Sequence, residues 1–400
     1  MSSYRIYCTA LIISISVVGC SKAAVRPEGP DCDSNAACTA PTGVCNLSSG
    51  TCVECTPSES TACVDKKPVC GADYTCQPCS LHSQCASNVC LPDGSCSTET
   101  NNTIAYVKEG GTGTTCTKAA PCALISTALA TRLPYIKIAG NIVDNVAVGN
   151  GQVVTLLADA GAKLTSKAND VLIKLDGSSR LTIYDLELSG TTAGQASDAI
   201  SMPAGNPSTL SLYRVKILRH AGAGIKAEGG TLNVYQSVIA ENKQGGIYIT
   251  GSTSFDIRNN FVAKNGDVFS LVGGIRAVGG GATSKIEFNT VVKNKAINAM
   301  SAGIDCSETV PAPYNLVFDN ALNDGVDKQI AGCDGSKSLQ GEPPAGAGFR
   351  DANAGDYHLT GNTAAEVRDK VNCDGNTVDI DGDSRPQADL CDFGADEYKP

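Results

Sequence analysis

Apolar and polar residues alternate along most of the chain after residue 103. The alternation occurs in short runs that are separated by turns rich in Gly and Asn. A period of two is typical of strands with one buried face, so the runs predict β-strands. They read KLTS, VLIKL, LTIYDLEL, TLSLYRVKIL, TLNVYQSVIA, SFDIRNNFVA and KIEFNTVV. Ahead of them, Ile125, Leu129 and Leu133 share one helical face, which predicts a short amphipathic helix.

The pattern Asn-x-(Val/Ile)-x-x-Asn recurs within these strands. It is written NFVAKN at 260–265, NTVVKN at 289–294, NLVFDN at 315–320 and, with Ser first, SVIAEN at 237–242; the intervals are 23, 29 and 26 residues. A single hairpin does not need such columns, but a coil that returns above itself does. In a parallel β-helix each residue lies ~4.8 Å from its equivalent in the next coil, so stacked Asn side chains form hydrogen bonds along the axis.

The charged residues fit the same register. Alignment on the repeats places opposite charges one coil apart in six pairs: Asp185 with Arg214, Glu187 with Lys216, Arg219 with Glu241, Asp256 with Lys285, Arg258 with Glu287 and Lys293 with Asp319. The one like-charged pair is Lys264 over Lys293. Each opposite pair contributes ~0.2–1 kcal/mol. We therefore interpret most charges in this region as ladder partners rather than catalytic groups.

Residues 103–335 resemble the right-handed parallel β-helix of the pectin-lyase-like superfamily. The entry segment is similar as well: Tyr106-Val107, a Gly-rich loop, then Pro121, Ile125, Ala128 and Leu129 in a capping helix. Residues 336–400 resemble a tail common on secreted bacterial β-helix proteins, with DYHL at 356–359, DIDGD at 379–383, Arg385-Pro386 and DFGADE at 392–397. The usual Ser-Pro-x-Ile-Asp-x-Gly is replaced by residues 362–369. The resemblance implies an all-β fold whose tail packs on or caps the β-helix.

The N-terminus has the features of an export signal. Arg5 is followed by an apolar run at 8–18, which is shorter than the ~20 residues of a bilayer span. Val17-Val18-Gly19-Cys20 resembles a bacterial lipoprotein box, in which Cys20 is acylated. We expect a signal peptide at 1–19 and an anchor linker at 20–31, with ordinary cleavage nearby as the alternative.

Cysteine spacing predicts disulfides. Without Cys8 and Cys20, 18 of the 20 Cys are left. Twelve form three similar units between residues 32 and 96. The other six are expected to pair as Cys116 with Cys122, Cys306 with Cys333, and Cys373 with Cys391. Even blocks in an exported chain indicate disulfides, and cross-links replace the core that such small units lack. Zinc is the alternative for residues 32–96, because Cys52-x2-Cys55 and Cys76-x2-Cys79 approach ribbon spacing. The module resembles Cys-rich repeats of bacterial surface lipoproteins and, more faintly, the Dickkopf-type fold, and we expect a stiff spacer.

Candidate ligand-binding residues lie in two columns. Lys226, Tyr248, Arg276 and Asp305 each follow a Gly-Ile pair, so they point outward on one strand position of successive coils. Two cations beside an aromatic ring suit an acidic sugar. The other column is Tyr184, Tyr213 and Tyr235, which either stabilise the sheet face or carry a sugar ring.

The sequence offers little for catalysis. The sugar-active motifs of the resembled superfamily are not found, and three His form no triad or metal cluster. Lys226 or Arg276 is the candidate base for an elimination. Asp379, Asp381 and Asp383 allow a loosely bound calcium ion, although Ser384 and Leu390 break the EF-hand pattern.

These features lead to one functional hypothesis and two alternatives. The net charge of −10 argues against nucleic acid and anionic membrane as electrostatic partners. We expect an exported lipoprotein, held at the outer membrane or cell surface by its lipid only. Its β-helix would bind polysaccharide or another envelope component without catalysis. The alternatives are a polysaccharide lyase or glycoside hydrolase, and a structural envelope protein.

Overall fold

The computed structural model describes residues 32–97, 103–167, 170–190, 197–280, 283–323, 328–341 and 348–400. Within it the chain divides into two compact units, one ending at Ser97 and one beginning at Thr98. The signal peptide, the linker at 20–31 and Cys20 lie outside the described residues. No helix in the described ranges is long and apolar enough to cross a bilayer.

The N-terminal unit is built from short elements and disulfides. Its 3-10 helices and strands are η1 (Asn35–Ala37), β1 (Val44–Asn46), β2 (Thr51–Val53), η2 (Ser60–Ala62), β3 (Val69–Cys70), β4 (Cys76–Gln77) and η3 (His82–Gln84). In each of the three Cys units, the first Cys bonds the third and the second bonds the fourth. The pairs are Cys32–Cys45, Cys38–Cys52, Cys55–Cys70, Cys63–Cys76, Cys79–Cys90 and Cys85–Cys96.

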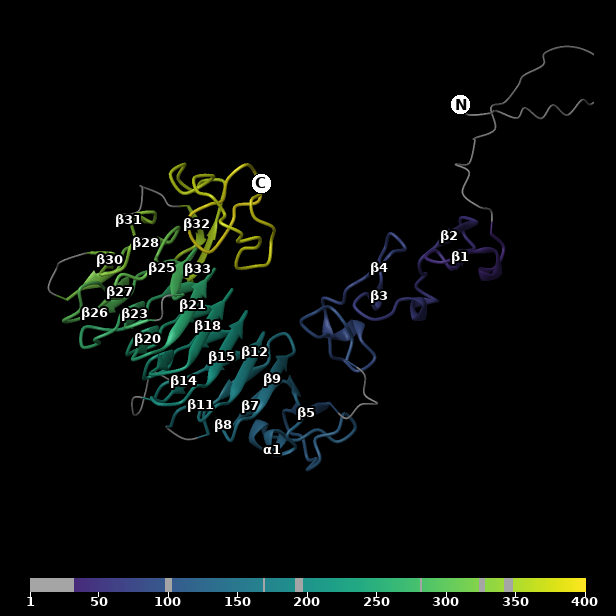
Figure 1. Ribbon diagram of the computed structural model, residues 1–400, viewed down its shortest axis with the longest axis horizontal. Helices are drawn as coiled ribbons and strands as arrows, with labels where there is room; N and C mark the ends of the chain where they lie inside the picture. The colour runs from purple at the N-terminus through teal and green to yellow at the C-terminus, as the bar shows by residue number, and fades with distance from the viewer. Residues whose placement is uncertain are drawn as a thin grey trace, which may run out of the picture. The chain divides into compact units, whose positions relative to one another are not determined.

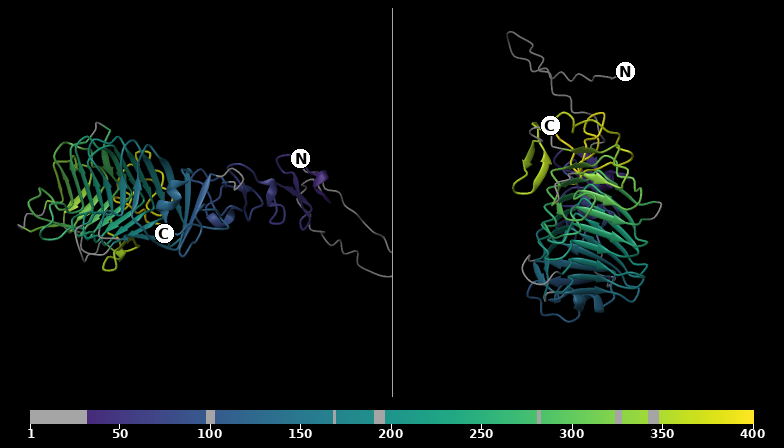
Figure 2. Two further views of the ribbon diagram at one scale, coloured as in Figure 1. Left: turned by 90° about the horizontal axis from the view of Figure 1, so that it is seen from below. Right: turned by 90° about the vertical axis from the view of Figure 1, so that its left-hand side faces the viewer.

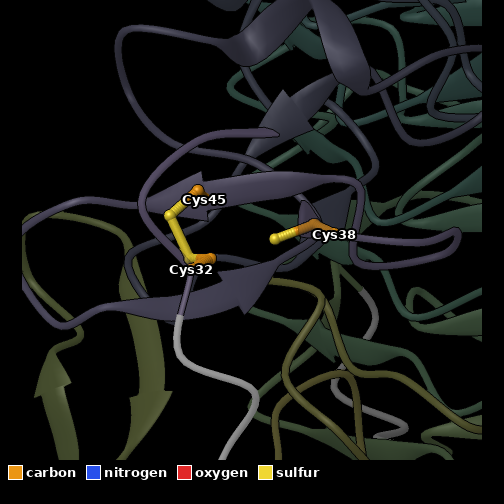
Figure 3. A group of neighbouring side chains, drawn as sticks. All are labelled: Cys32, Cys38 and Cys45. Atoms are coloured by element: carbon orange, nitrogen blue, oxygen red, sulfur yellow. A yellow bond between two sulfur atoms is a disulfide. The ribbon is translucent and has the colours of Figure 1, made fainter. Parts of the chain in front are cut away.

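These pairings explain why the Cys sulfurs gather as metal ligands would. Cys32, Cys38 and Cys45 lie together, and Figure 3 shows the bond that joins Cys32 to Cys45. Because both sulfurs of each pair are joined in a disulfide, neither is a thiolate that could bind zinc. The zinc alternative for this module is therefore wrong, and the disulfide-rich module is confirmed.

The second unit coils through three parallel sheets, and between residues 135 and 306 successive turns pass through them in the same order (Figure 1). The first sheet holds β5 (Ile104–Lys108), β6 (Tyr135–Ala139), β9 (Val153–Ala158), β12 (Arg180–Tyr184), β15 (Thr209–Tyr213), β18 (Thr231–Tyr235), β21 (Ser254–Arg258) and β24 (Lys285–Glu287). The second holds β7 (Asn141–Val143), β10 (Lys163–Thr165), β13 (Glu187–Ser189), β16 (Lys216–Leu218), β19 (Val238–Ala240), β22 (Phe261–Ala263), β25 (Thr290–Val292), β28 (Leu316–Phe318) and β31 (Leu339–Gly341).

The third sheet carries the candidate groove described below. It holds β8 (Val146–Val148), β11 (Ile173–Leu175), β14 (Ile200–Met202), β17 (Ile225–Ala227), β20 (Ile247–Thr250), β23 (Ile275–Val278), β27 (Ile304–Cys306) and β30 (Ile330–Ala331). A small pair, β26 (Lys295–Ala296) and β29 (Ala321–Leu322), lies outside the three sheets. The alternating apolar residues point inward and form one continuous core, as in Ile247 and Ile249, which are fully buried.

Helix α1 (Ile125–Ala130) lies at the first coil, as Figures 1 and 2 show. Its buried residues Ile125, Ala128 and Leu129 pack on the core, so the expected amphipathic helix is present. Leu133 follows the helix and packs on the same core. The disulfide Cys116–Cys122 closes the loop that precedes the helix.

The Asn columns form the expected hydrogen-bonded ladders. In one, Asn260 Nδ2 donates to Asn289 Oδ1 (2.9 Å), and Asn289 Nδ2 donates to Asn315 Oδ1 (3.0 Å). In the other, the same bond links Asn242, Asn265, Asn294 and Asn320 at 2.8–3.0 Å. Each Asn also accepts a bond from the backbone of the preceding coil, so these buried amides are satisfied inside the stack.

The charge register is also present, although the ion pairs differ in detail. Asp185 and Arg214 form a bidentate pair at 2.7 and 3.0 Å. Glu187 lies beside Lys216 in register, but its carboxylate contacts Lys163 (3.0 Å) and Arg219 (3.7 Å) instead. A flexible side chain on a sheet face reaches diagonal neighbours as easily as the one directly opposite.

The tail lies along the outward face of the second sheet. It contains the hairpin β32 (Phe349–Asp351) and β33 (Asp356–Leu359), and the disulfide Cys373–Cys391. Tyr357, Val367, Ile380 and other tail residues bury the outward-facing apolar side chains of the sheet, such as Phe261 and Phe318.

Strand β31 still pairs with β28, so the coil extends past the boundary at 335 that the sequence suggested. The disulfide Cys306–Cys333 joins the end of β27 to the turn that follows β30.

Candidate functional site

The four residues that follow the Gly-Ile pairs form one column on the outward face of the third sheet. Lys226 of β17 pairs with Tyr248 of β20, Tyr248 pairs with Arg276 of β23, and Arg276 pairs with Asp305 of β27. Their strand neighbours on both sides are buried, which directs these four side chains away from the core. The repeat alone thus places the column.

Arg276 is not a free cation in this column. Its Nη1 donates a 2.8 Å hydrogen bond to the carbonyl of Leu271, and its Nε lies 3.5 Å from Asp305 Oδ2. Asp305 is 4% exposed, and burial raises the pKa of its carboxyl group while Arg276 and the Met300 backbone act in the opposite direction. The pair therefore holds the loop at 266–272 against the sheet.

That loop is ordered by its own hydrogen bonds. Asp267 Oδ1 accepts from the backbone N–H of Phe269 (2.8 Å), and Ser270 Oγ donates to the carbonyl of Val272 (2.5 Å). The Ser270 carbonyl accepts from Ile297 N–H (2.7 Å), which joins the loop to the next coil. The loop nevertheless presents apolar side chains to solvent: Phe269 is 84% exposed and Leu271 is 57% exposed.

A groove of about 600 Å³ runs between this loop and the third sheet. Lys226 and Tyr248 line it from the sheet, Phe269 and Leu271 line it from the loop, and Lys243 lines it from the turn after β19. Clefts of this size with aromatic walls and a few polar groups are typical of small-ligand and carbohydrate sites. The groove combines two aromatic rings with two ammonium groups.

The charged side chains that line the groove differ in the ion pairs and hydrogen bonds that they form. Lys226 Nζ lies 3.2 Å from Glu228 Oε1, whereas the exposed Lys243 has no ion pair with any described residue. The carboxylates Asp198 and Asp267 also line the groove, but each accepts a backbone N–H at 2.8 Å. Burial raises the pKa of Asp198. Lys243, Asp198 and Asp267 therefore form no ion pair with a described residue, and Lys243 is the cation among them.

Sequence reasoning missed Phe269 and Lys243. A signal was present: eight residues (266–273) separate Asn265 from Gly274, whereas three (243–245) separate Asn242 from Gly246. An insertion at this point that contains exposed apolar residues marks a loop that overhangs the strand. The repeat alignment did not assign it a role, because an insertion has no partner in the neighbouring coil.

The tyrosine column lies on a different face, along the first sheet. Tyr184 and Tyr213 are stacked with ring centroids 4.7 Å apart, and Tyr213 and Tyr235 lie 5.1 Å apart in a tilted arrangement. The guanidinium of Arg258 lies 5.1 Å from the centre of the Tyr235 ring. Burial raises the pKa of Tyr184 to about 12. These rings already stack on one another, so their geometry accounts for stabilisation of the sheet.

Comparison with known families decides the fold type. Residues 162–323 match the family model Beta_helix, described as "Right handed beta helix region". The body of this chain is a right-handed parallel β-helix. Among solved structures, a pectate lyase, Pel9A, is similar at 14% sequence identity; the match covers 74% of this chain and 96% of that chain with a TM-score of 0.39. No curated protein matches this chain.

The β-helix and its tail enclose a second hollow of about 470 Å³. The second sheet contributes Lys216 and Arg219 to its wall, and the tail contributes Asp356, His358 and Asp381. The hollow contains cations and carboxylates in similar numbers, so it has no marked charge of one sign. Its tail side is the more unusual, because one imidazole is surrounded there by carboxylates.

The three Asp residues that could hold calcium each contact different partners. Asp379 is 1% exposed, and its Oδ1 accepts backbone N–H groups of Asp381 and Asp383 at 3.0 and 2.8 Å. Asp383 lies 3.2 Å from Lys399, and Asp381 lies beside His358. Asp379 therefore organises the turn, and a calcium ion at these three residues stays a prediction.

Proposed function

We propose that this protein is an exported, lipid-anchored cell-surface protein whose groove on the third sheet binds acidic polysaccharide without cleaving it. The observation that carries this proposal is the groove itself. Tyr248 and Phe269 offer ring faces on which a sugar can stack, and Lys243 offers an unpaired ammonium for a carboxylate.

The support of the groove favours binding to a pre-formed surface. The bond from Arg276 to the Leu271 carbonyl and the bonds within loop 266–272 fix Phe269 opposite the sheet before any ligand arrives. Binding to an ordered wall avoids part of the entropy cost of ordering a loop. The repeat pattern predicts that Arg276 contacts the sugar directly, but its bond to the loop gives it a supporting role in this proposal.

The arrangement of carboxylates separates binding from hydrolysis. Hydrolysis uses two carboxyl groups across the scissile bond. Among the described residues, Arg276 has one carboxylate beside it, Asp305, and the groove carboxylates Asp198 and Asp267 are used by backbone N–H groups. We therefore favour binding over a lyase or hydrolase, and product release in the assay below is the result that would reverse this choice.

Export rests on the disulfides. The described residues contain nine of them, and such cross-links persist in oxidising compartments outside the cytosol. The lipid at Cys20 rests on the short apolar run and the box that precedes it. The disulfide module then serves as the spacer between anchor and β-helix.

The test is a panel of glycans with the full chain: polygalacturonate, alginate and hyaluronan as acidic polymers, and dextran as a neutral one. We expect binding to acidic polymers that weakens as salt is added, because ion pairs at exposed ammonium groups are screened. Tyr248→Ala and Phe269→Ala should each weaken binding about fivefold to tenfold, the value of one stacking contact of about 1–1.4 kcal/mol. Arg276→Ala should weaken it by releasing the loop.

Lys174→Ala is the matched control, because Lys174 lies on the same sheet face at β11 but does not line the groove. It should bind like the parent, whereas Lys243→Ala should not. The proposal is wrong if no acidic glycan binds, or if the groove variants and the control behave alike. New chain ends or unsaturated products in the same samples would show an enzyme instead.

A further inference from the structure

Three separate segments of the tail meet around His358. His358 lies on β33, Asp381 lies in the turn at 379–383, and Asp396 lies four residues before the end of the chain. One ligand atom from each of the three residues lies within 4.8 Å of the other two. Among the described residues no strand pairing joins these three segments to one another. The Ile380 N–H donates to the Ala395 carbonyl (2.9 Å), and side-chain contacts provide the other links.

The imidazole is oriented as a metal ligand is. Its Nδ1 contacts Asp356 Oδ1, a carboxylate on the same strand, which leaves Nε2 directed at the other two residues. A carboxylate that holds the far nitrogen of a ligating His is a recurrent feature of metal sites, because it fixes both tautomer and ring orientation. Asp396 is held similarly, since its Oδ2 accepts the backbone N–H of Leu359 (2.6 Å).

The distance between His358 Nε2 and Asp381 Oδ2 is that of two ligands of one metal ion, but the two atoms do not have the geometry of a hydrogen bond. Nε2 lies 3.0 Å from Asp381 Oδ2, yet this buried nitrogen has no partner with hydrogen-bond geometry among the described residues. Bonds of about 2.1 Å at 90–110° place two ligand atoms about 3.0–3.4 Å apart. The observed separation fits two donors that share one ion.

The local charge also calls for a cation. Three carboxyl groups, those of Asp356, Asp381 and Asp396, surround the imidazole. Arg350 lies 3.5 Å from Asp356 on the strand beside it. Such an excess of acid around one partly buried imidazole is normally compensated by a bound cation or by protons.

The neighbouring acidic cluster shows what a purely structural arrangement looks like. Asp392 accepts the backbone N–H groups of Asp369 and Tyr398, and Glu397 accepts those of Asp392 and Gln387. Its oxygens are therefore used by the backbone. The group around His358 differs, because its Nε2 has no partner with hydrogen-bond geometry among the described residues. His358 and Asp381 also line the hollow.

We propose that His358, Asp381 and Asp396 bind a first-row divalent cation, Zn²⁺ or Mn²⁺, that ties the three tail segments together on the side of the β-helix. One imidazole with two carboxylates suits these ions, whereas Ca²⁺ prefers oxygen ligands alone. Water from the hollow supplies the other ligands. Binding displaces a proton from the imidazole, so the cation binds more tightly as pH rises.

The test uses the full chain with Cys8→Ser and Cys20→Ser, which leaves every other Cys in a disulfide and so removes thiols as zinc ligands. After treatment with a chelator, the protein is dialysed against ZnCl₂, MnCl₂ or CaCl₂, and bound metal is counted by mass spectrometry. We expect one Zn²⁺ or Mn²⁺ per chain, no stoichiometric Ca²⁺, and a higher melting temperature when the metal is bound.

His358→Ala and Asp381→Asn should each weaken metal binding at least tenfold and abolish the rise in melting temperature. Asp381 is half exposed, so its variant keeps the tail folded, and near-UV circular dichroism of the Tyr residues verifies this. Asp383→Asn is the control in the same turn and should bind like the parent. The proposal is overturned if the parent binds no metal at one per chain, if His358→Ala binds equally well, or if Asp383→Asn loses binding to the same extent.

Discussion

Asn289 occupies the middle of one Asn ladder, and its replacement by Ala measures what the ladder contributes. The side chain is fully buried. Its Oδ1 accepts from both the backbone N–H (3.1 Å) and Nδ2 (2.9 Å) of Asn260, and its Nδ2 donates to the carbonyl of Ile257 (2.9 Å) and to Asn315. The variant removes these bonds at once and brings no new partner.

The cost follows from the groups that are left without partners. Asn315 keeps a donor, the backbone N–H of residue 289 (2.8 Å), so its oxygen stays satisfied. Asn260 loses the acceptor for its backbone N–H and for one amide hydrogen, both buried. A buried donor without a partner costs about 1–3 kcal/mol, so we expect Asn289→Ala to lower the free energy of unfolding by about 3 kcal/mol.

Urea unfolding followed by far-UV circular dichroism measures this change, because the chain has no Trp to report on folding. Hydrogen exchange should show lost protection in the coils on either side of residue 289 and little change near helix α1, since each coil contacts only its neighbours. Asn323→Ala, an exposed site on the next coil, is the control and should change stability by less than about 0.5 kcal/mol. A loss of similar size in both variants would refute the ladder as a source of stability.

Two further predictions concern His220 and Cys20. His220 is 4% exposed, and burial lowers its pKa from 6.5 to about 4. Between these pH values the unfolded chain binds more protons than the folded chain. The folded protein therefore loses stability as the pH drops from 6.5 to 4. This lowers the free energy of unfolding by at most about 3 kcal/mol. His220→Asn, which places Asn beside Asn242 in the ladder column, should lose less stability between pH 7 and pH 4 in urea unfolding. An equal loss in the variant and the parent would contradict this. Cys20→Ala should move the protein from the membrane fraction to the soluble fraction, and unchanged fractionation with no lipid on the N-terminal peptide would end the lipoprotein hypothesis.

The features that repeat along the chain were predictable from the sequence. Each coil of a β-helix places equivalent residues above one another, so the recurrence of Asn260, Asn289 and Asn315 was enough to give the register that the hydrogen bonds show. The alternation of apolar residues gave the inward positions for the same reason. Phe261 and Phe318 are outward yet apolar, and the tail covers them.

The features that do not repeat were less accessible. Loop 266–272 is an insertion without a counterpart in the adjacent coil, so its contact with Arg276 depends on three-dimensional closure that no column reveals. His358, Asp381 and Asp396 are separated by 23 and 15 residues of irregular tail. Their approach to one another results from the way the tail packs on the second sheet, and the sequence pattern does not encode that packing as a period.

The most direct test of the account is hydrogen exchange on the full chain with and without saturating polygalacturonate. A ligand in the groove should slow exchange in peptides that cover residues 243–250 and 266–276, because these segments carry Lys243, Tyr248 and Phe269. Peptides that carry the tyrosine column on the first sheet should be unchanged. Protection on the first sheet or at the tail instead, or no protection anywhere at saturation, would contradict the assignment of the groove as the polysaccharide site.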